Sequence, residues 1–141
     1  DYLRDKINYI NQKTILLDKS VIENMKYGNN MDNNQIIDFL NKYDLRVVFS
    51  GLKDNIYEHC STGGNNLSLG MQKIIILVRG VIKSKKNLII FFDEPLAGLD
   101  EITRKKVIKM ILKECKGKTI IIITHDKEII PYMDRVHKLT E

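Results

Sequence analysis

The sequence contains little cysteine and no long hydrophobic run. Cys60 and Cys115 are far apart and lack the spacing of metal ligands, so we expect two free thiols in a reducing compartment. The apolar runs are only a few residues long, whereas a membrane-spanning helix needs about 20 apolar residues. No secretory signal opens the chain. These shortages argue against a disulfide framework, and they predict no membrane span within the 141 residues.

The composition is that of one ordinary globular domain, with 43% hydrophobic and 29% charged residues. The net charge of +5 raises the question of a nucleic-acid or anionic-membrane partner. Many of the lysines belong to a predicted amphipathic helix over 101–116, where they lie opposite an apolar stripe. The stripe is Val107, Ile108, Ile111 and Leu112, and the lysines are Lys105, Lys109, Lys113 and Lys116. A solvated lysine face explains these charges, so we expect no nucleic-acid partner.

The stretch Leu88–Asp100 (LIIFFDEPLAGLD) organises the chain. Its apolar half, Leu88–Phe92, predicts a strand buried on both faces, as in parallel sheets. Ligands of open parallel sheets bind at the carboxyl ends of the strands, which is where Asp93 and Glu94 follow. One of these acids can hold Mg²⁺ beside a triphosphate, while the other orients or deprotonates a water molecule. An ordinary acidic turn is the alternative, but it would not need the LAGLD that comes next.

Three other segments place polar groups at the ends of predicted elements. Ser68 is a good N-cap for a strongly apolar helix over Leu69–Lys83, whose first amides would form an anion site. Such a capped helix start is commonplace by itself. The apolar strand Thr119–Ile123 ends just before His125, and the short strand Lys6–Ile10 ends just before Gln12.

Two further elements are expected. Asp32 and Gln35 resemble a capping arrangement, and helical spacing follows them, so Asn33–Tyr43 is a predicted helix. Arg135–Leu139 is expected to form a final strand. The stretch from Gln12 to Gly28 shows no clean period.

Taken together, these phrases resemble the nucleotide-binding domain of exporter-type ATP-binding-cassette (ABC) transporters. Leu88–Asp100 matches the Walker B motif and D-loop, Gln12 the Q-loop, and His125 the switch histidine. The phrase Glu23-Asn24-x-x-Tyr27-Gly28 is typical of exporters. The signature, usually Leu-Ser-Gly-Gly-Gln, matches Leu67, Ser68, Leu69, Gly70 and Met71, with departures at its third and fifth places.

The resemblance implies an α/β fold: a partial P-loop NTPase core with a mostly parallel sheet, plus a helical subdomain that carries the signature. Residues 1–31 would be the Q-loop segment, 32–86 the helical subdomain, and 87–141 the Walker B, D-loop and H-loop part.

The resemblance also implies ATP and Mg²⁺ as ligands and a role for each motif. Gln12 would sense Mg²⁺ and the attacking water, and Asp93 would hold the metal through water. Glu94 would activate the attacking water, and His125 would contact the γ-phosphate. Asp100 would signal across a dimer of cassettes. Leu67 to Met71 would bind the nucleotide held by the opposite cassette.

The sequence lacks the G-x-x-x-x-G-K-[ST] loop that cradles phosphates. Its only GKT, at 117–119, precedes a strand where a P-loop would follow one, and is therefore a decoy. In the family the P-loop lies upstream of the Q-loop, so we expect this chain to be the carboxyl-terminal part of a cassette. We also expect the P-loop strand to insert between Leu88–Phe92 and Thr119–Ile123. Its absence would leave a gap and an unstable, inactive isolated chain.

Three functions remain open on this evidence. The first is the ATPase portion of a membrane exporter, at the cytoplasmic face, with transmembrane domains and a second cassette as partners. The second is a soluble ABC-type ATPase that acts on nucleic acid or chromosomes. The third is a non-catalytic partner that lends its signature helix to an intact cassette.

Overall fold

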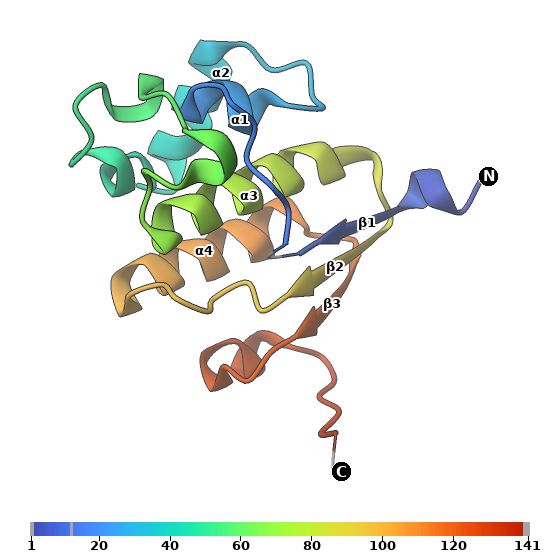
Figure 1. Ribbon diagram of the computed structural model, residues 1–141. Helices are drawn as coiled ribbons and strands as arrows, with labels where there is room; N and C mark the ends of the chain where they lie inside the picture. Colours follow the sequence, from blue (N-terminus) through green and yellow to red (C-terminus); the bar gives the residue numbers. More distant parts are fainter. Residues whose placement is uncertain (1, 12, 140–141) are drawn as a thin grey trace.

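The computed structural model describes residues 2–11 and 13–139. A three-stranded sheet lies beside two long helices, and a cluster of shorter helices sits beyond them (Figure 1). The strands are β1 (Ile7–Ile10), β2 (Ile89–Asp93) and β3 (Thr119–Ile123). The α-helices are α1 (Val21–Lys26), α2 (Asn33–Lys42), α3 (Leu69–Lys83) and α4 (Glu101–Glu114). Six short 3-10 helices are η1 (Arg4–Lys6), η2 (Arg46–Phe49), η3 (Asn55–Tyr57), η4 (Thr62–Gly64), η5 (Ser84–Lys86) and η6 (Lys127–Tyr132).

The sheet is parallel throughout, in the order β1-β2-β3. We expected a gap between the strands at Leu88–Phe92 and Thr119–Ile123, and this prediction is wrong. Strands β2 and β3 pair directly, from Ile89↔Thr119 to Asp93↔Ile123. Both strands are five residues long, so the backbone groups on their facing edges pair with each other. The gap that we expected between these strands is therefore absent, whereas the instability of the isolated chain stays a prediction.

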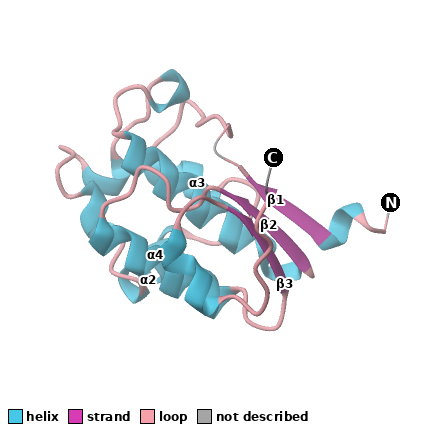
Figure 2. Ribbon diagram, turned by 90° about the horizontal axis from the view of Figure 1, so that it is seen from below, coloured by secondary structure: helices cyan, strands magenta, loops and turns pink. Residues whose placement is uncertain are grey.

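The sheet is covered on one face only within the described residues (Figure 2). In β2, Ile90 and Phe92 are buried, whereas Ile89 and Phe91, which alternate with them along the strand, are half-buried. The predicted burial of this strand on both faces is therefore wrong. The uncovered face also carries exposed apolar side chains from the two edge strands, namely Ile7, Tyr9, Ile121 and Ile123.

Helix α3 joins the sheet to the helical part of the molecule. Its observed bounds agree with those predicted, and its core side chains are buried around most of the circumference. It contacts α1 on one side and β1 on the other. At Gly80 a Cβ would lie 2.6 Å from Ile10 Cδ1, so only glycine allows this close approach to β1.

The remaining expectations have mixed outcomes. The capping box of Asp32 and Gln35 is present at the start of α2. The stretch before Gly28, which shows no clean period, contains α1, and this helix begins at an unpredicted capping box of Ser20 and Glu23.

Residues 135–139 form no strand, so the prediction of a final strand there is wrong. No helix among the described residues has both the length and the apolarity to cross a membrane. The division at residues 31 and 86 stays a prediction.

Candidate functional site

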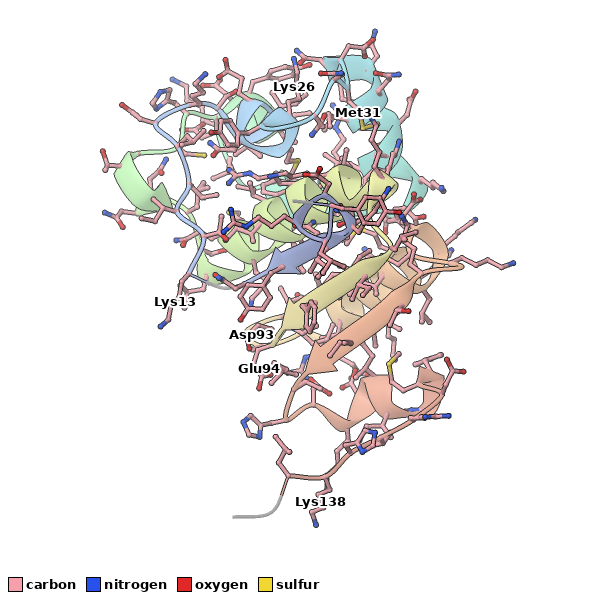
Figure 3. All side chains as sticks on the ribbon, turned by 90° about the vertical axis from the view of Figure 1, so that its right-hand side faces the viewer. Lys13, Lys26, Met31, Asp93, Glu94 and Lys138 are labelled. Atoms are coloured by element: carbon pink, nitrogen blue, oxygen red, sulfur yellow. The ribbon has the colours of Figure 1, made fainter. Side chains whose placement is uncertain are left out.

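Asp93 and Glu94, at the end of β2, lie at the carboxyl end of the sheet (Figure 3). Asp93 ends the strand, and Glu94 follows with a φ of 48°, in the left-handed region that side-chain-bearing residues seldom adopt. The Glu94 amide donates to the Ile123 carbonyl at 2.8 Å, which ties this turn to the end of β3. Such unfavourable backbone geometry persists only where neighbouring groups fix it, and it is common at functional sites.

Glu94 and His125, which the sequence places 31 residues apart, meet in the structure. The Glu94 carboxylate accepts the His125 amide at 3.2 Å and the Thr124 hydroxyl at 3.2 Å. His125 Nε2 lies 3.6 Å from Glu94 Oε1, and the imidazole is fully exposed. A carboxylate held by fixed donors beside an exposed imidazole suits proton transfer involving a substrate at the sheet edge.

Asp93 has a partner that the sequence did not reveal. Tyr9 donates its hydroxyl to Asp93 Oδ2 at 3.0 Å, across neighbouring parallel strands. This hydrogen bond, followed by burial and the Asp93 charge, raises the pKa of Tyr9. The signal for it was the position of Tyr9 in β1, on the face to which Asp93 also belongs.

A Mg²⁺ ion would find few protein ligands here. No cluster of three or more acidic, histidine or cysteine side chains within residues 2–11 and 13–139 could hold a metal. Mg²⁺ usually keeps several waters and binds one or two carboxylates together with substrate phosphates. The single carboxylate of Asp93 therefore fits a metal held mainly by a nucleotide.

The signature segment forms the open amino end of α3. The Ser68 hydroxyl accepts the Met71 amide at 3.2 Å, which confirms the predicted N-cap. Leu67 is buried, whereas Leu69 is 78% exposed. A Cβ at Gly70 would meet nothing closer than 3.9 Å on other parts of the chain, so internal packing does not demand glycine there. The open helix end and this small residue leave room for an anion to approach the amides.

The D-loop lies against the signature. The ideal Cβ of Gly70 would be 3.9 Å from the Gly98 carbonyl oxygen and from Leu99 Cδ2. Asp100 is the N-cap of α4, because its carboxylate accepts the amide and the hydroxyl of Thr103, both at 2.8 Å. These bonds lower the pKa of Asp100. In this structure Asp100 thus acts locally, on its own helix.

Two polar contacts of α3 were missed in the sequence. Lys73, on α3, donates to the Glu94 carbonyl at 2.9 Å. Arg79, also on α3, is buried and donates to the backbone carbonyl and the side-chain oxygen of Asn24, both at 2.7 Å. A charged residue within a helix that is apolar almost all round was the available signal, because such residues are buried only with a partner.

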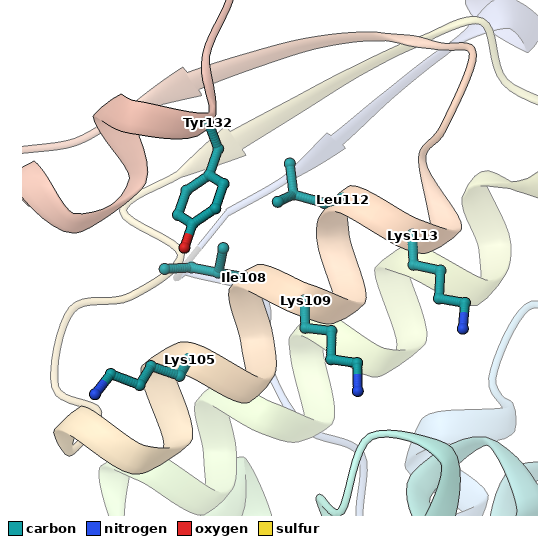
Figure 4. A pocket seen from close by; sticks show the side chains of 6 residues that line it. All are labelled: Lys105, Ile108, Lys109, Leu112, Lys113 and Tyr132. Atoms are coloured by element: carbon teal, nitrogen blue, oxygen red, sulfur yellow. The ribbon is translucent and has the colours of Figure 1, made fainter.

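Other predicted positions lie away from these acids. Gln12 lies outside the described residues. The decoy GKT is at the opposite end of β3, where Lys118 Nζ donates to the carbonyls of Ser84, Lys85 and Asn87. A hollow of about 420 Å³ opens over α4 and contains no predicted site residue (Figure 4). It is lined by Lys105, Ile108, Lys109, Leu112, Lys113 and Tyr132.

The geometry defines a class of protein. A parallel sheet with Asp93, Glu94 and His125 at one edge, next to a capped signature helix and a D-loop, is the arrangement expected of part of an ABC-type nucleotide-binding domain. No family model matches the chain.

Individual relatives do match the chain, and they are ABC exporter proteins. The chain is 33% identical over 135 residues to the ABC transporter ATM1 of Plasmodium falciparum, a match that covers 95% of this chain and 13% of that protein. It is 31% identical over 139 residues to the lacticin-481/lactococcin-DR transport/processing ATP-binding protein lcnDR3 of Lactococcus lactis, covering 95% and 20%. It is 28% identical to the alpha-hemolysin translocation ATP-binding protein HlyB of Escherichia coli, covering 96% and 19%.

A solved structure supports the fold. A bacterial Atm1-family ABC exporter with ATP bound aligns with a TM-score of 0.78 at 19% identity, over 90% of this chain and 22% of that one. The predicted resemblance to ABC exporters and the predicted fold class are thereby confirmed. The chain spans a fifth or less of these three curated relatives. A soluble ATPase that acts on nucleic acid is not favoured by them.

Proposed function

We propose that this chain is part of the ATP-hydrolysing portion of an ABC exporter, at the cytoplasmic face of a membrane, and that it works with transmembrane domains and a second cassette. The observation that carries the proposal is the Glu94 carboxylate, which Thr124 and the His125 amide hold at the carboxyl end of β2. The exporter relatives support the direction of transport.

Each site residue has a proposed task. Glu94 accepts the proton of the attacking water, and the exposed His125 imidazole contacts the γ-phosphate. Asp93 would hold Mg²⁺ through water, and Gln12 would sense the Mg²⁺ and the attacking water. The ion would neutralise phosphate charge. Ser68 and the amides after it bind the γ-phosphate of nucleotide held by the opposite cassette, within the Leu67–Met71 signature. Asp100 signals between the cassettes.

The 141 residues alone are expected neither to bind ATP tightly nor to hydrolyse it. The reason is that their sequence contains no P-loop, whose amides and lysine make most of the phosphate contacts. Steady hydrolysis by the purified 141-residue chain, lost in Glu94→Gln, would contradict this.

The test of the proposed function is Glu94→Gln in the protein that carries this chain. The amide keeps the packing but cannot take a proton, so ATP turnover should fall about 10²–10⁴-fold while ATP binding persists. That is roughly 3–5 kcal/mol of barrier. The matched control is Glu101→Gln, which removes a charge from an exposed acid whose partner is Lys105. Unchanged turnover in Glu94→Gln would mean that Glu94 is an ordinary turn residue.

A further inference from the structure

Lys73 connects α3, the helix that begins in the signature, to the turn at Glu94. It belongs to α3, one helical turn after Gly70, so both residues lie on the same face of the helix. Gly70 faces the Gly98–Leu99 part of the D-loop, and Lys73 Nζ donates to the Glu94 carbonyl at 2.9 Å. This face of α3 therefore touches both ends of the segment that links β2 to α4.

The position of Lys73 is not that of a surface lysine. It is half-buried, and the three residues after it, Ile74, Ile75 and Ile76, are buried. The hollow that it lines with Asp93 and Pro95 has only about 10 Å³, which is at the limit for a single water molecule.

The bond falls at a residue with an unfavourable backbone conformation. Glu94 has a left-handed φ, and its peptide groups are fixed by three hydrogen bonds. Its amide donates to the Ile123 carbonyl at 2.8 Å, and its carbonyl accepts Lys73 Nζ and, at a longer 3.3 Å, the Ala97 amide. Of these, only the Lys73 bond comes from a side chain, and only it comes from the signature helix.

We propose that Lys73 is a positioning residue that transmits the placement of the signature helix to Glu94. A movement of α3 that accompanies phosphate binding at Ser68 and Gly70 would displace the Glu94 carbonyl, and with it the carboxylate beside His125. Hydrolysis would then depend on an occupied signature. This inference rests on the proposed function of Glu94.

The test compares Lys73→Met with Lys83→Met in the protein that carries this chain. Methionine keeps the apolar stem of Lys73 and removes its ammonium, and Lys83 is an exposed lysine at the other end of the same helix. The first readout is amide hydrogen exchange without nucleotide. We expect faster exchange at Glu94 and His125 in Lys73→Met, unchanged protection along α3, and no change in Lys83→Met.

The second readout is steady-state ATP hydrolysis. Misplacing a catalytic group by about 1 Å can cost up to about 10²-fold, so kcat should fall about ten- to a hundredfold in Lys73→Met. KM should stay within about twofold, because Lys73 donates to Glu94, which acts on the attacking water and not on the nucleotide. Adding Lys73→Met to Glu94→Gln should cause no further loss, since both changes act through one carboxylate. A general weakening of the fold would instead add to the effect of Glu94→Gln and reduce protection along α3.

Unchanged exchange at Glu94 and His125, or unchanged kcat, in Lys73→Met would overturn the inference. The proposed function would still stand on Glu94→Gln alone, and it would fail separately if that variant kept full turnover. If Lys73→Met does not fold, Lys73→Gln is used in its place and carries the same expectations, because a shorter amide suits a half-buried site but cannot reach as far.

Discussion

A buried polar network around Asn24 gives a sharp test of the fold that supports this site. Asn24 Oδ1 accepts the Leu17 amide at 2.8 Å and Arg79 Nη2 at 2.7 Å. Its Nδ2 donates to the carbonyls of Leu17, Lys19 and Ser20. The network binds the segment after the predicted Q-loop to α3. The perturbation is Asn24→Ala, which removes all of these side-chain bonds.

The cost follows from which groups lose their last partner. The three carbonyls keep other donors, namely the amides of Lys19, Cys60 and residue 24 itself. The Leu17 amide loses the Asn24 Oδ1 acceptor, and the Arg79 guanidinium loses one of its two hydrogen bonds. Leaving a buried donor unsatisfied costs about 1–3 kcal/mol, and more for a charged one. We therefore expect Asn24→Ala to lower the free energy of unfolding by about 3–5 kcal/mol.

The assay is urea denaturation of the purified protein that carries this chain. Asn34→Ala, at an exposed asparagine of α2, is the matched control and should change stability by less than about 0.5 kcal/mol. The double variant Asn24→Ala/Arg79→Met removes the orphaned charge together with its partner, so it should cost less than the sum of the two single changes. A loss below about 1 kcal/mol for Asn24→Ala, or strict additivity in the double variant, would refute the reasoning.

Two further predictions concern the signature and the thiols. Met71→Gln should raise turnover at saturating ATP only about two- to tenfold, because it restores one or two side-chain hydrogen bonds of about 0.5–1.5 kcal/mol each. Turnover is measured in a membrane or detergent preparation. A fall in turnover, or a gain of several hundredfold, would contradict this. Burial raises the pKa of Cys115 to about 11 and also raises that of Cys60. At pH 8 only about one Cys115 in a thousand is then a thiolate, so iodoacetamide should label neither cysteine before unfolding; stoichiometric labelling of the native protein would count against their burial.

The sequence by itself determined the elements whose signals are local. Ser68 and Asp32 begin helices because a side-chain oxygen can cap the first amides whatever the rest of the fold does. The apolar run before Asp93 is a strand, and the run before His125 is another, because continuous apolar residues of that length suit a parallel sheet. The motif phrases were equally local, and they were sufficient to indicate the family resemblance that the exporter relatives support.

Only the tertiary structure decided which strands are neighbours and which side chains meet. Period and length do not encode the order of parallel strands, so the sequence could not show that β2 pairs with β3. Nor could the sequence show that one sheet face stays uncovered. A run of isoleucines such as that of β3 has the same sequence pattern whether one face of the strand or both faces are buried. Contacts such as Lys73 with Glu94 and Arg79 with Asn24 join residues 21 and 55 positions apart. They exist because the close approach of α3 to β1 at Gly80 helps to set where that helix lies, and this packing is a property of the assembled fold.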